Sequence, residues 1–208
     1  MTTLNDVCEF VRGPFGGSLK KEIFVKDGFK VYEQKNAIQN DFSIGRYFID
    51  EAKFNEMKRF EVFPDDLIIS CSGTMGKIAI APKNIKRGII NQALLKLTPD
   101  TSKTSAFFIK LWLETEFIQS NYFRDNSGAA IQNVSSVKYL KEIPFPDISL
   151  SEQEEIANQI QQHLKKIDVL ESEIKIEQSS INDIVKSISH NEKEYKVNDE
   201  KLSIAAEE

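Results

Sequence analysis

Isoleucine recurs at seven-residue intervals over the last third of the chain, and this repeat is the strongest pattern in the sequence. The repeat positions are Ile160, Ile167, Ile174, Ile181 and Ile188. Further apolar side chains fall three or four positions from them, namely Ile156, Leu164, Leu170, Ile184 and Val185. A sustained seven-residue repeat is typical of a helix whose apolar stripe packs against another helix. The pattern therefore predicts a long pairing helix over residues 149–190.

This helix is expected to begin at a capping box and to need a partner. Ser151 is the predicted N-cap, with Glu154 at the third helical position. At about 1.5 Å per residue the helix would be about 60 Å long. Since the sequence offers no second segment of matching length, we expect the partner helix to come from a second copy of the chain. The alternative is that the helix packs back on its own domain. Residues 191–208 are polar and are expected to form a disordered tail.

Shorter patterns before residue 149 predict one domain of mixed secondary structure. Apolar runs bounded by Gly, Pro or polar residues predict strands at 29–32, 47–50, 67–70, 78–80 and 89–97. The strands at 67–70 and 78–80 are expected to form a hairpin, and a polar loop is expected between the first two strands. Helices are predicted at 51–60, 105–123 and 134–140, the second capped by Ser105. These elements predict an α+β fold for residues 1–148.

Charge divides the chain at the same boundary. Residues 1–148 carry 20 Lys and Arg against 18 Asp and Glu, whereas residues 149–208 carry 7 against 14. The mildly basic first part is compatible with DNA binding, although a balance of +2 is weak evidence by itself. Cys8 and Cys71 lack metal-site spacing and predict buried thiols in a reducing compartment. With no signal pattern and no apolar run of membrane length, we expect a cytoplasmic protein without membrane contact.

Motifs that would carry catalysis fail on spacing. Residues 72–77 have two residues between their glycines where a phosphate-binding loop needs four, and Ile78 stands where Ser or Thr would bind magnesium. A glycine-shaped turn is the better interpretation. His163 and His190 lie on or next to the predicted helix, so no histidine serves the first domain as a base or metal ligand. We predict a non-catalytic chain with no metal and no cofactor of its own.

A series of short motifs follows in order along the chain. They are Leu4-x-Asp6-Val7-Cys8 with Arg12-Gly13, GRYFID at 45–50, PxDLIISxSGTxGK at 64–77, GIINQ at 88–92, GAAIxN at 128–133, LKxIPFP at 140–146 and LSEQxxI at 150–156. Each motif is weak alone. Together and in this order they resemble one half of the specificity subunit (S, or HsdS) of a type I restriction-modification system.

The resemblance implies a target recognition domain over residues 1–148 followed by a single spacer helix, whereas full-length members carry two of each. It implies a prokaryotic protein that binds double-stranded DNA and assembles with methyltransferase (M) subunits, which restriction (R) subunits can join. S-adenosylmethionine and adenine methylation would belong to the M subunits. A half-length chain is expected to pair with a second copy and to read a two-part inverted-repeat site.

Under this resemblance the DNA-contacting candidates are polar and basic side chains on loops. They are Ser18, Lys20, Lys21, Lys35, Asn36, Arg46, Ser72, Thr74, Lys77, Arg87, Asn91, Gln92, Arg124, Gln132 and Asn133. The competing interpretation is that the lysines are only solvated and that the amides support turns. Base reading is expected to concentrate in residues 15–45 and 120–133.

The predicted dimerisation residues are Ile160, Ile167, Ile174, Ile181, Ile188, Leu164, Leu170 and Ile184. His163 and Glu177 share the stripe and are expected to weaken or specify the pairing locally. A second hypothesis is a coiled-coil adaptor or an inhibitory or spare specificity fragment that pairs through the helix without reading DNA itself.

Overall fold

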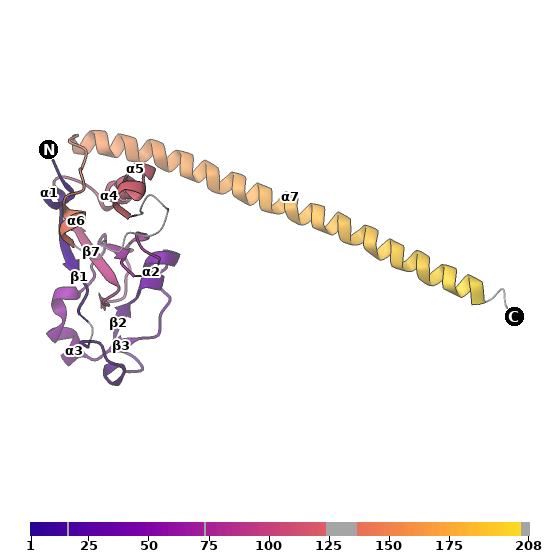
Figure 1. The fold of residues 1–208 in the computed structure, drawn as a ribbon, viewed down its shortest axis with the longest axis horizontal. Coiled ribbons are helices and arrows are strands. Elements are labelled where there is room, and N and C mark those ends of the chain that lie inside the picture. Colours follow the sequence, from indigo (N-terminus) through magenta and orange to yellow (C-terminus); the bar gives the residue numbers. More distant parts are fainter. Residues whose placement is uncertain (16, 73, 124–136, 205–208) are drawn as a thin grey trace. The chain divides into compact units, whose positions relative to one another are not determined.

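The computed structural model describes residues 1–15, 17–72, 74–123 and 137–204, and for 189–204 the backbone alone. It separates into a first unit, residues 1–157, and a second unit, residues 158–208 (Figure 1). We describe each unit by itself. The predicted α+β class is confirmed, with strands in the first unit and a long C-terminal helix.

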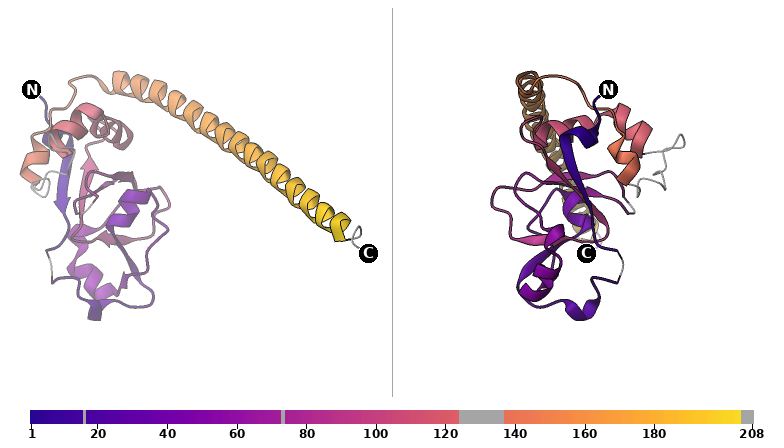
Figure 2. Two further views of the ribbon diagram at one scale, coloured as in Figure 1. Left: turned by 45° about the vertical axis from the view of Figure 1, so that its right-hand side comes forward. Right: turned by 90° about the vertical axis from the view of Figure 1, so that its left-hand side faces the viewer.

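Two sheets organise the first unit. The antiparallel four-stranded sheet has the order β1 (Cys8–Arg12), β7 (Leu94–Pro99), β4 (Leu67–Ser70) and β5 (Ile78–Ile80). The three-stranded sheet has β2 (Phe29–Tyr32) at its centre, antiparallel to β3 (Phe48–Ile49) and parallel to β6 (Gly88–Ile90). The four-stranded sheet lies nearer α1 and α4, and the three-stranded sheet lies nearer α3 (Figures 1 and 2).

The four-stranded sheet is buried on both faces, which explains the continuous apolar run of β4. Leu67 and Ile69 belong to one core cluster and Ile68 belongs to another, since alternate side chains of a strand point to opposite faces. The first cluster is covered by α1 (Leu4–Val7), α4 (Ala106–Leu113), α5 (Glu116–Ile118) and α6 (Val137–Lys141). On the other face, α2 (Gln34–Gln39) packs through Ala37 beside Ile68.

A third cluster belongs to the three-stranded sheet. Phe54 of α3 (Glu51–Glu56) packs there with Val31 and Ile89. Two short 3-10 helices, η1 (Lys21–Ile23) and η2 (Lys58–Phe60), and a π-helical turn, η3 (Gln119–Phe123), complete the described elements of this unit.

One buried ion pair lies beside the four-stranded sheet. The Lys96 ammonium is 3.4 Å from Asp66 Oδ2 and donates to the carbonyl of Glu61 at 2.7 Å. The two oxygens of Asp66 also accept from Thr98 Oγ1 at 2.5 Å and from the backbone N–H of Phe63 at 2.8 Å. Both charges therefore have the hydrogen-bond partners that burial demands.

The strand predictions hold except in one region. The strands at 29–32, 67–70 and 78–80 and the hairpin are confirmed. The single strand predicted at 89–97 is wrong, because β6 and β7 belong to different sheets. A turn separates them, in which Asn91 Oδ1 accepts from the N–H of Ala93 at 3.0 Å.

One loop prediction and two helix predictions also need correction. The predicted polar loop between the first two strands contains α2. The helix predicted over 51–60 divides into α3 and η2, and the helix predicted over 105–123 divides into α4, α5 and η3. Ser105 caps α4 as expected, its Oγ accepting from the N–H of Phe108 at 3.1 Å. Thr115 then starts a new helix by accepting from the N–H of Ile118 at 3.4 Å.

The long helix α7 runs from Leu150 to Ile204. Its capping box is formed by Ser149 and Glu152 instead of the predicted Ser151 and Glu154. Glu152 Oε2 accepts from the N–H of Ser149 at 2.9 Å, and Ser149 Oγ accepts from the N–H of Glu152 at 3.3 Å. The helix also continues through residues 191–204, where we expected a disordered tail; residues 205–208 lie outside the described part.

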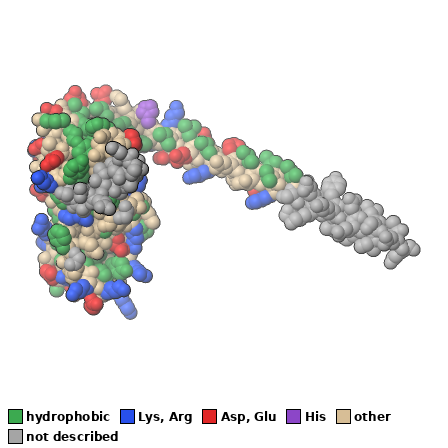
Figure 3. All heavy atoms as spheres, in the orientation of Figure 1, with side chains coloured by type: hydrophobic (Ala, Val, Ile, Leu, Met, Phe, Trp, Pro, Cys, Tyr) green, Lys and Arg blue, Asp and Glu red, His purple; other side chains and the backbone are tan. Residues whose placement is uncertain are grey.

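In the second unit the repeat positions are not buried. From Leu164 at 43% to Ile184 at 60% exposure, the predicted dimerisation residues beyond Ile160 lie in solvent. Figure 3 shows hydrophobic side chains spread along the helix. Within the described part of the chain, no helix combines the length and apolar composition needed to cross a membrane.

Candidate nucleic-acid interface

The loops that carry most of the predicted DNA contacts open where the two sheets meet. In the four-stranded sheet, the C-terminal ends of β1 and β4 lie beside the N-terminal ends of β7 and β5. In the three-stranded sheet, β2 and β6 end where β3 begins. Residues 91–93 join the end of β6 to the start of β7, so they bring these ends of the two sheets together. We call the loops 13–21, 33–47, 71–77 and 91–93 the strand-end junction.

Backbone hydrogen bonds join residues 91–94 to β2 and to the loops that follow β1 and β4. The N–H of Gly13 donates to the carbonyl of Leu94 at 2.9 Å, and the N–H of Cys71 donates to that of Ala93 at 2.8 Å. The N–H of Asn91 donates to the carbonyl of Tyr32 at 2.9 Å. A cavity of about 160 Å³ lies among these loops and is lined by Leu19, Phe24, Val31, Glu33, Tyr47, Asn91 and Gln92. Segments distant in sequence therefore form one continuous surface.

Gly13 fixes the start of the loop that follows β1. A Cβ atom at this position would collide with the backbone carbonyl of Asn91, so only glycine allows the two segments to approach. The preceding side chain holds the same region, since Arg12 Nη1 donates to the carbonyl of Leu94 at 2.6 Å. Ser18, Lys20 and Lys21 are exposed on this loop.

The segment after β2 is held by two buried polar side chains. Asn36 Nδ2 donates to the carbonyls of Asp41 and Ile44 at 2.8 and 2.9 Å, and its Oδ1 accepts from the N–H of Glu33. Lys30 Nζ donates to the carbonyls of Phe42 and Ser43, which lie between Asp41 and Ile44. Burial of the Lys30 ammonium lowers its pKa. We therefore assign Asn36, a predicted DNA contact, to support of this loop.

The turn between β4 and β5 is shaped by Ser70 and Gly76. Ser70 Oγ donates to the carbonyl of Thr74 at 2.7 Å and accepts from the N–H of Lys77 at 3.0 Å. Gly76 has a φ of +74° and would collide with the ring of Phe123 if it carried a side chain. The turn thus presents Ser72, Thr74 and Lys77 to solvent beside the residues that lead into segment 124–136.

The remaining candidates at the junction differ in how free they are. Gln92 is exposed, whereas Asn91 uses its side-chain oxygen within its own turn. Lys35 is half-buried and pairs with Glu33 at 2.9 Å. Arg46 is exposed, with its guanidinium 5.5 Å from the ring centre of Tyr47.

Arg87 is the one described candidate that the fold does not bring to the junction. It precedes β6 and so lies at the opposite end of the strands of the three-stranded sheet. Its Nε donates to Glu61 Oε1 at 3.0 Å, and its guanidinium lies 4.9 Å from the ring of Phe54 and 5.3 Å from that of Phe29. The Arg87 side chain is nevertheless 63% exposed, and its DNA contact stays a prediction. Arg124, Gln132 and Asn133 lie outside the described residues.

Phe15 is a junction residue that the sequence prediction missed. Its side chain is 86% exposed on the loop after β1. Selecting polar and basic residues excluded it, although an aromatic residue between a proline and two glycines is itself a signal of a projecting side chain.

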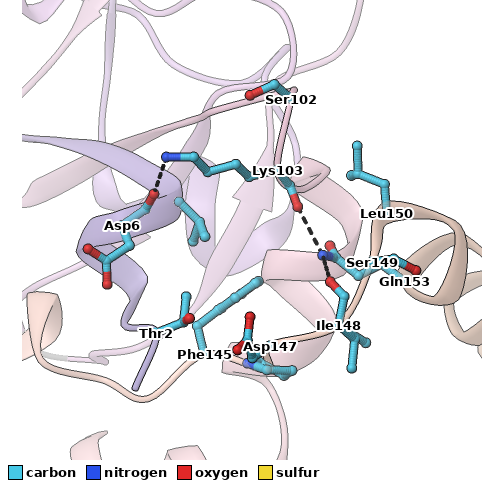
Figure 4. Close-up of a pocket in the computed structure, with 12 residues that line it drawn as sticks. Thr2, Asp6, Ser102, Lys103, Phe145, Asp147, Ile148, Ser149, Leu150 and Gln153 are labelled. Carbon is cyan, nitrogen blue, oxygen red and sulfur yellow. Dashed lines mark hydrogen bonds between the residues drawn. The ribbon is translucent and has the colours of Figure 1, made fainter.

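A larger cavity of about 460 Å³ lies at the start of α7, away from the junction (Figure 4). Gln153 Nε2 donates there to the carbonyls of Lys103 and Ile148 at 2.9 and 3.1 Å. Lys103 Nζ in turn donates to the carbonyl of Asp6 at 2.9 Å. The close-up shows these groups engaging one another, so we assign them to anchoring the first turns of the helix.

Comparison with known proteins places the chain in a family. Residues 1–178 match the family model described as the type I restriction modification DNA specificity domain. The chain is 24% identical over 189 residues to the type I restriction enzyme EcoBI specificity subunit of Escherichia coli, a match that covers 90% of this chain and 39% of that protein.

Two solved structures share the fold. The HsdS subunit from Thermoanaerobacter tengcongensis matches with a TM-score of 0.58 and 19% identity, over 81% of this chain and 38% of that one. A chain from a structure concerned with assembly and conformational transition of the type I R-M system matches with a TM-score of 0.61 and 18% identity, at the same coverages. The chain thus spans about two fifths of the length of these relatives. Because the family model covers most of its length, the chain belongs to the type I restriction-modification DNA specificity domain family.

Proposed function

We propose that this chain is the DNA-recognition module of a type I restriction-modification complex. The observation that carries the proposal is the strand-end junction, where loops from both sheets present exposed polar and basic side chains. Those are Ser18, Lys20, Lys21, Ser72, Thr74, Lys77 and Gln92. Membership of a family described by its DNA specificity supports the same function.

Recognition would divide between two kinds of contact. Lys20, Lys21 and Lys77 carry positive charge to the phosphate backbone, which positions the duplex without reading it. Gln92 and Arg46 have the paired donors or acceptors that match a base edge, and each good pair is worth about 1–3 kcal/mol of discrimination. The supports described above, at Gly13, Asn36 and Ser70, hold these loops before DNA arrives.

The chain itself would make and break no bonds. Adenine methylation would be carried out by M subunits that hold S-adenosylmethionine, and R subunits would join where DNA is also cut. This chain would select the site and hold the duplex for them.

We further propose that two copies pair through the second unit. The exposed stripe of α7 would be buried between two helices, as a seven-residue repeat requires. A symmetric pair would present two identical recognition surfaces, so the preferred DNA would contain the same half-site twice in inverted orientation.

Salt dependence of DNA binding tests the junction directly. Replacing Lys20 and Lys21 by Gln removes two phosphate contacts, so the slope of log affinity against log salt should become shallower by about 1.8. The matched control, Lys58→Gln with Lys83→Gln, removes the same net charge from exposed lysines away from the junction and should leave the slope unchanged.

Binding would be measured by fluorescence anisotropy on a labelled duplex, for the full chain and for its complex with the methyltransferase. Equal slopes for the two double variants would refute a role of the junction. Failure of both preparations to prefer a selected duplex over random duplex would refute DNA recognition altogether.

A further inference from the structure

We propose that Phe15 inserts between stacked bases of the bound duplex and holds it distorted at the recognition site. This inference rests on the proposed DNA-recognition function and adds a wedge to it. The starting observation is a Phe side chain that is 86% exposed on the strand-end junction. This ring contributes nothing to the core of the domain. Since single exposed apolar side chains are common on protein surfaces, the proposal depends on the backbone and the charged neighbours of Phe15.

Two other described phenylalanines are exposed, each by a smaller fraction. Phe63 is 51% exposed and has the Lys96 ammonium 5.5 Å from its ring centre. Phe117 is 58% exposed on α5. Among the described residues, Phe15 enters no aromatic pair and no cation–π contact.

The backbone before Phe15 is rigid, as a wedge needs. Gly13 is pressed against the carbonyl of Asn91 and donates its N–H to Leu94, and Pro14 is buried with a ring-restricted φ. After the ring, the N–H of Ser18 donates back to the carbonyl of Phe15 at 3.3 Å. The side chain therefore projects from a short turn whose base is fixed to the sheet.

The surroundings of Phe15 suit DNA as the occupant. Exposed Lys20 and Lys21 follow it on the same loop, and exposed Gln92 comes from the segment against which the loop is pinned. Lysines attract the phosphate backbone, while apolar wedges in DNA-binding proteins enter between base steps and kink or unwind the duplex. Phe15 would thus read how easily the bases at one step unstack.

Plasmid unwinding tests the wedge. The probe is a closed circular plasmid that carries copies of the duplex enriched by the wild-type complex from a random library, relaxed by a topoisomerase in the presence of the full chain and its methyltransferase. Wild-type protein should shift the topoisomer distribution. Phe15→Ala should remove the shift and weaken binding about tenfold, since base–aromatic stacking is lost. Phe15→Trp should retain the shift.

Phe63→Ala is the matched control. Phe63 is an exposed ring that precedes β4 and so lies at the end of the four-stranded sheet opposite the junction, and this variant should behave as wild type. A Phe15→Ala complex that unwinds the plasmid as wild type does would overturn the inference. A Phe15→Ala chain that no longer binds the methyltransferase but binds the duplex with wild-type affinity would also overturn it, because the ring would then contact protein and not DNA. If the wild-type complex enriches no duplex at all, the proposed DNA-recognition function fails. This result differs from the two outcomes above, which concern Phe15 alone.

Discussion

The first unit and the helix of the second unit differ in how far their apolar side chains are buried. In the first, Ile68 and Ile69 are almost fully buried between sheets and helices, whereas in the second, Ile174 and Ile181 are more than half exposed. Both segments carry an apolar pattern, a continuous run in β4 and a seven-residue repeat in α7. The difference is that the first unit contains the surfaces that cover its pattern, so its core is complete. The pattern of α7 requires a surface from outside, for which we propose a second copy.

The largest effect is expected from breaking the helix stripe. Ile167→Asp with Ile174→Asp places two charges at the helix pairing surface, where burial of an unpaired charge is strongly unfavourable. We predict conversion of the dimer to a monomer, seen as a halved mass by light scattering. Val169→Asp with Ile176→Asp is the matched control, since these residues are at least as exposed but lie off the repeat. A stable dimer after the first pair of changes would show that the stripe is not the interface.

A smaller effect is expected from the core of the first unit. Asp66→Ala leaves the buried Lys96 ammonium without its carboxylate, which typically costs about 3–5 kcal/mol. Thr98→Val, which removes one hydrogen bond to Asp66, should cost about 1 kcal/mol. Both losses, measured by urea unfolding, should be the same in the dimer and in the monomeric helix variant. Unequal losses would mean that the first unit depends on the pairing helix.

The smallest effect concerns the two cysteines, which probe how closed the first unit is. Burial raises the pKa of Cys8 to about 12 and also raises that of Cys71. The reactive thiolate is therefore scarce at pH 8, below these raised pKa values. We predict that iodoacetamide modifies neither thiol in the native protein at pH 8 and modifies both in urea. Rapid labelling of the native protein, followed by mass spectrometry, would contradict a closed core.

Local signals in the sequence account for the elements that were predicted correctly. Leu67–Ser70 is an apolar run bounded by acidic residues and a glycine-containing turn, and it forms the expected strand and hairpin. Ser105 caps its helix through the expected hydrogen bond. These features depend on neighbours in the chain, so they are visible without knowledge of the fold.

The features that were missed depend on choices between local alternatives or on distant contacts. Ser-x-x-Glu occurs at both 149–152 and 151–154, and the chain uses the first. The turn at Asn91 is hidden because apolar residues flank it on both sides, although the two strands belong to different sheets. Helix α2 lacks an apolar stripe and is held largely by buried Asn36 and Ala37.

The candidate site was predictable as a set of loops but not as a surface. Its residues are spread from Ser18 to Gln92, and only the strand order brings them to one junction. The same strand order places Arg87 at the end of the three-stranded sheet opposite the junction. Phe15 was missed because only polar and basic residues were selected as candidates, although its position between Pro14 and two glycines signals a projecting side chain.

Selection of duplexes from a random DNA library is the most direct test of the account. The wild-type complex with its methyltransferase should enrich one half-site in two inverted copies at a fixed spacing. The Ile167→Asp with Ile174→Asp variant should enrich a single copy with lower affinity. Enrichment of an unrepeated site by the wild-type complex would contradict pairing of two recognition surfaces, and no enrichment would contradict DNA recognition by this chain.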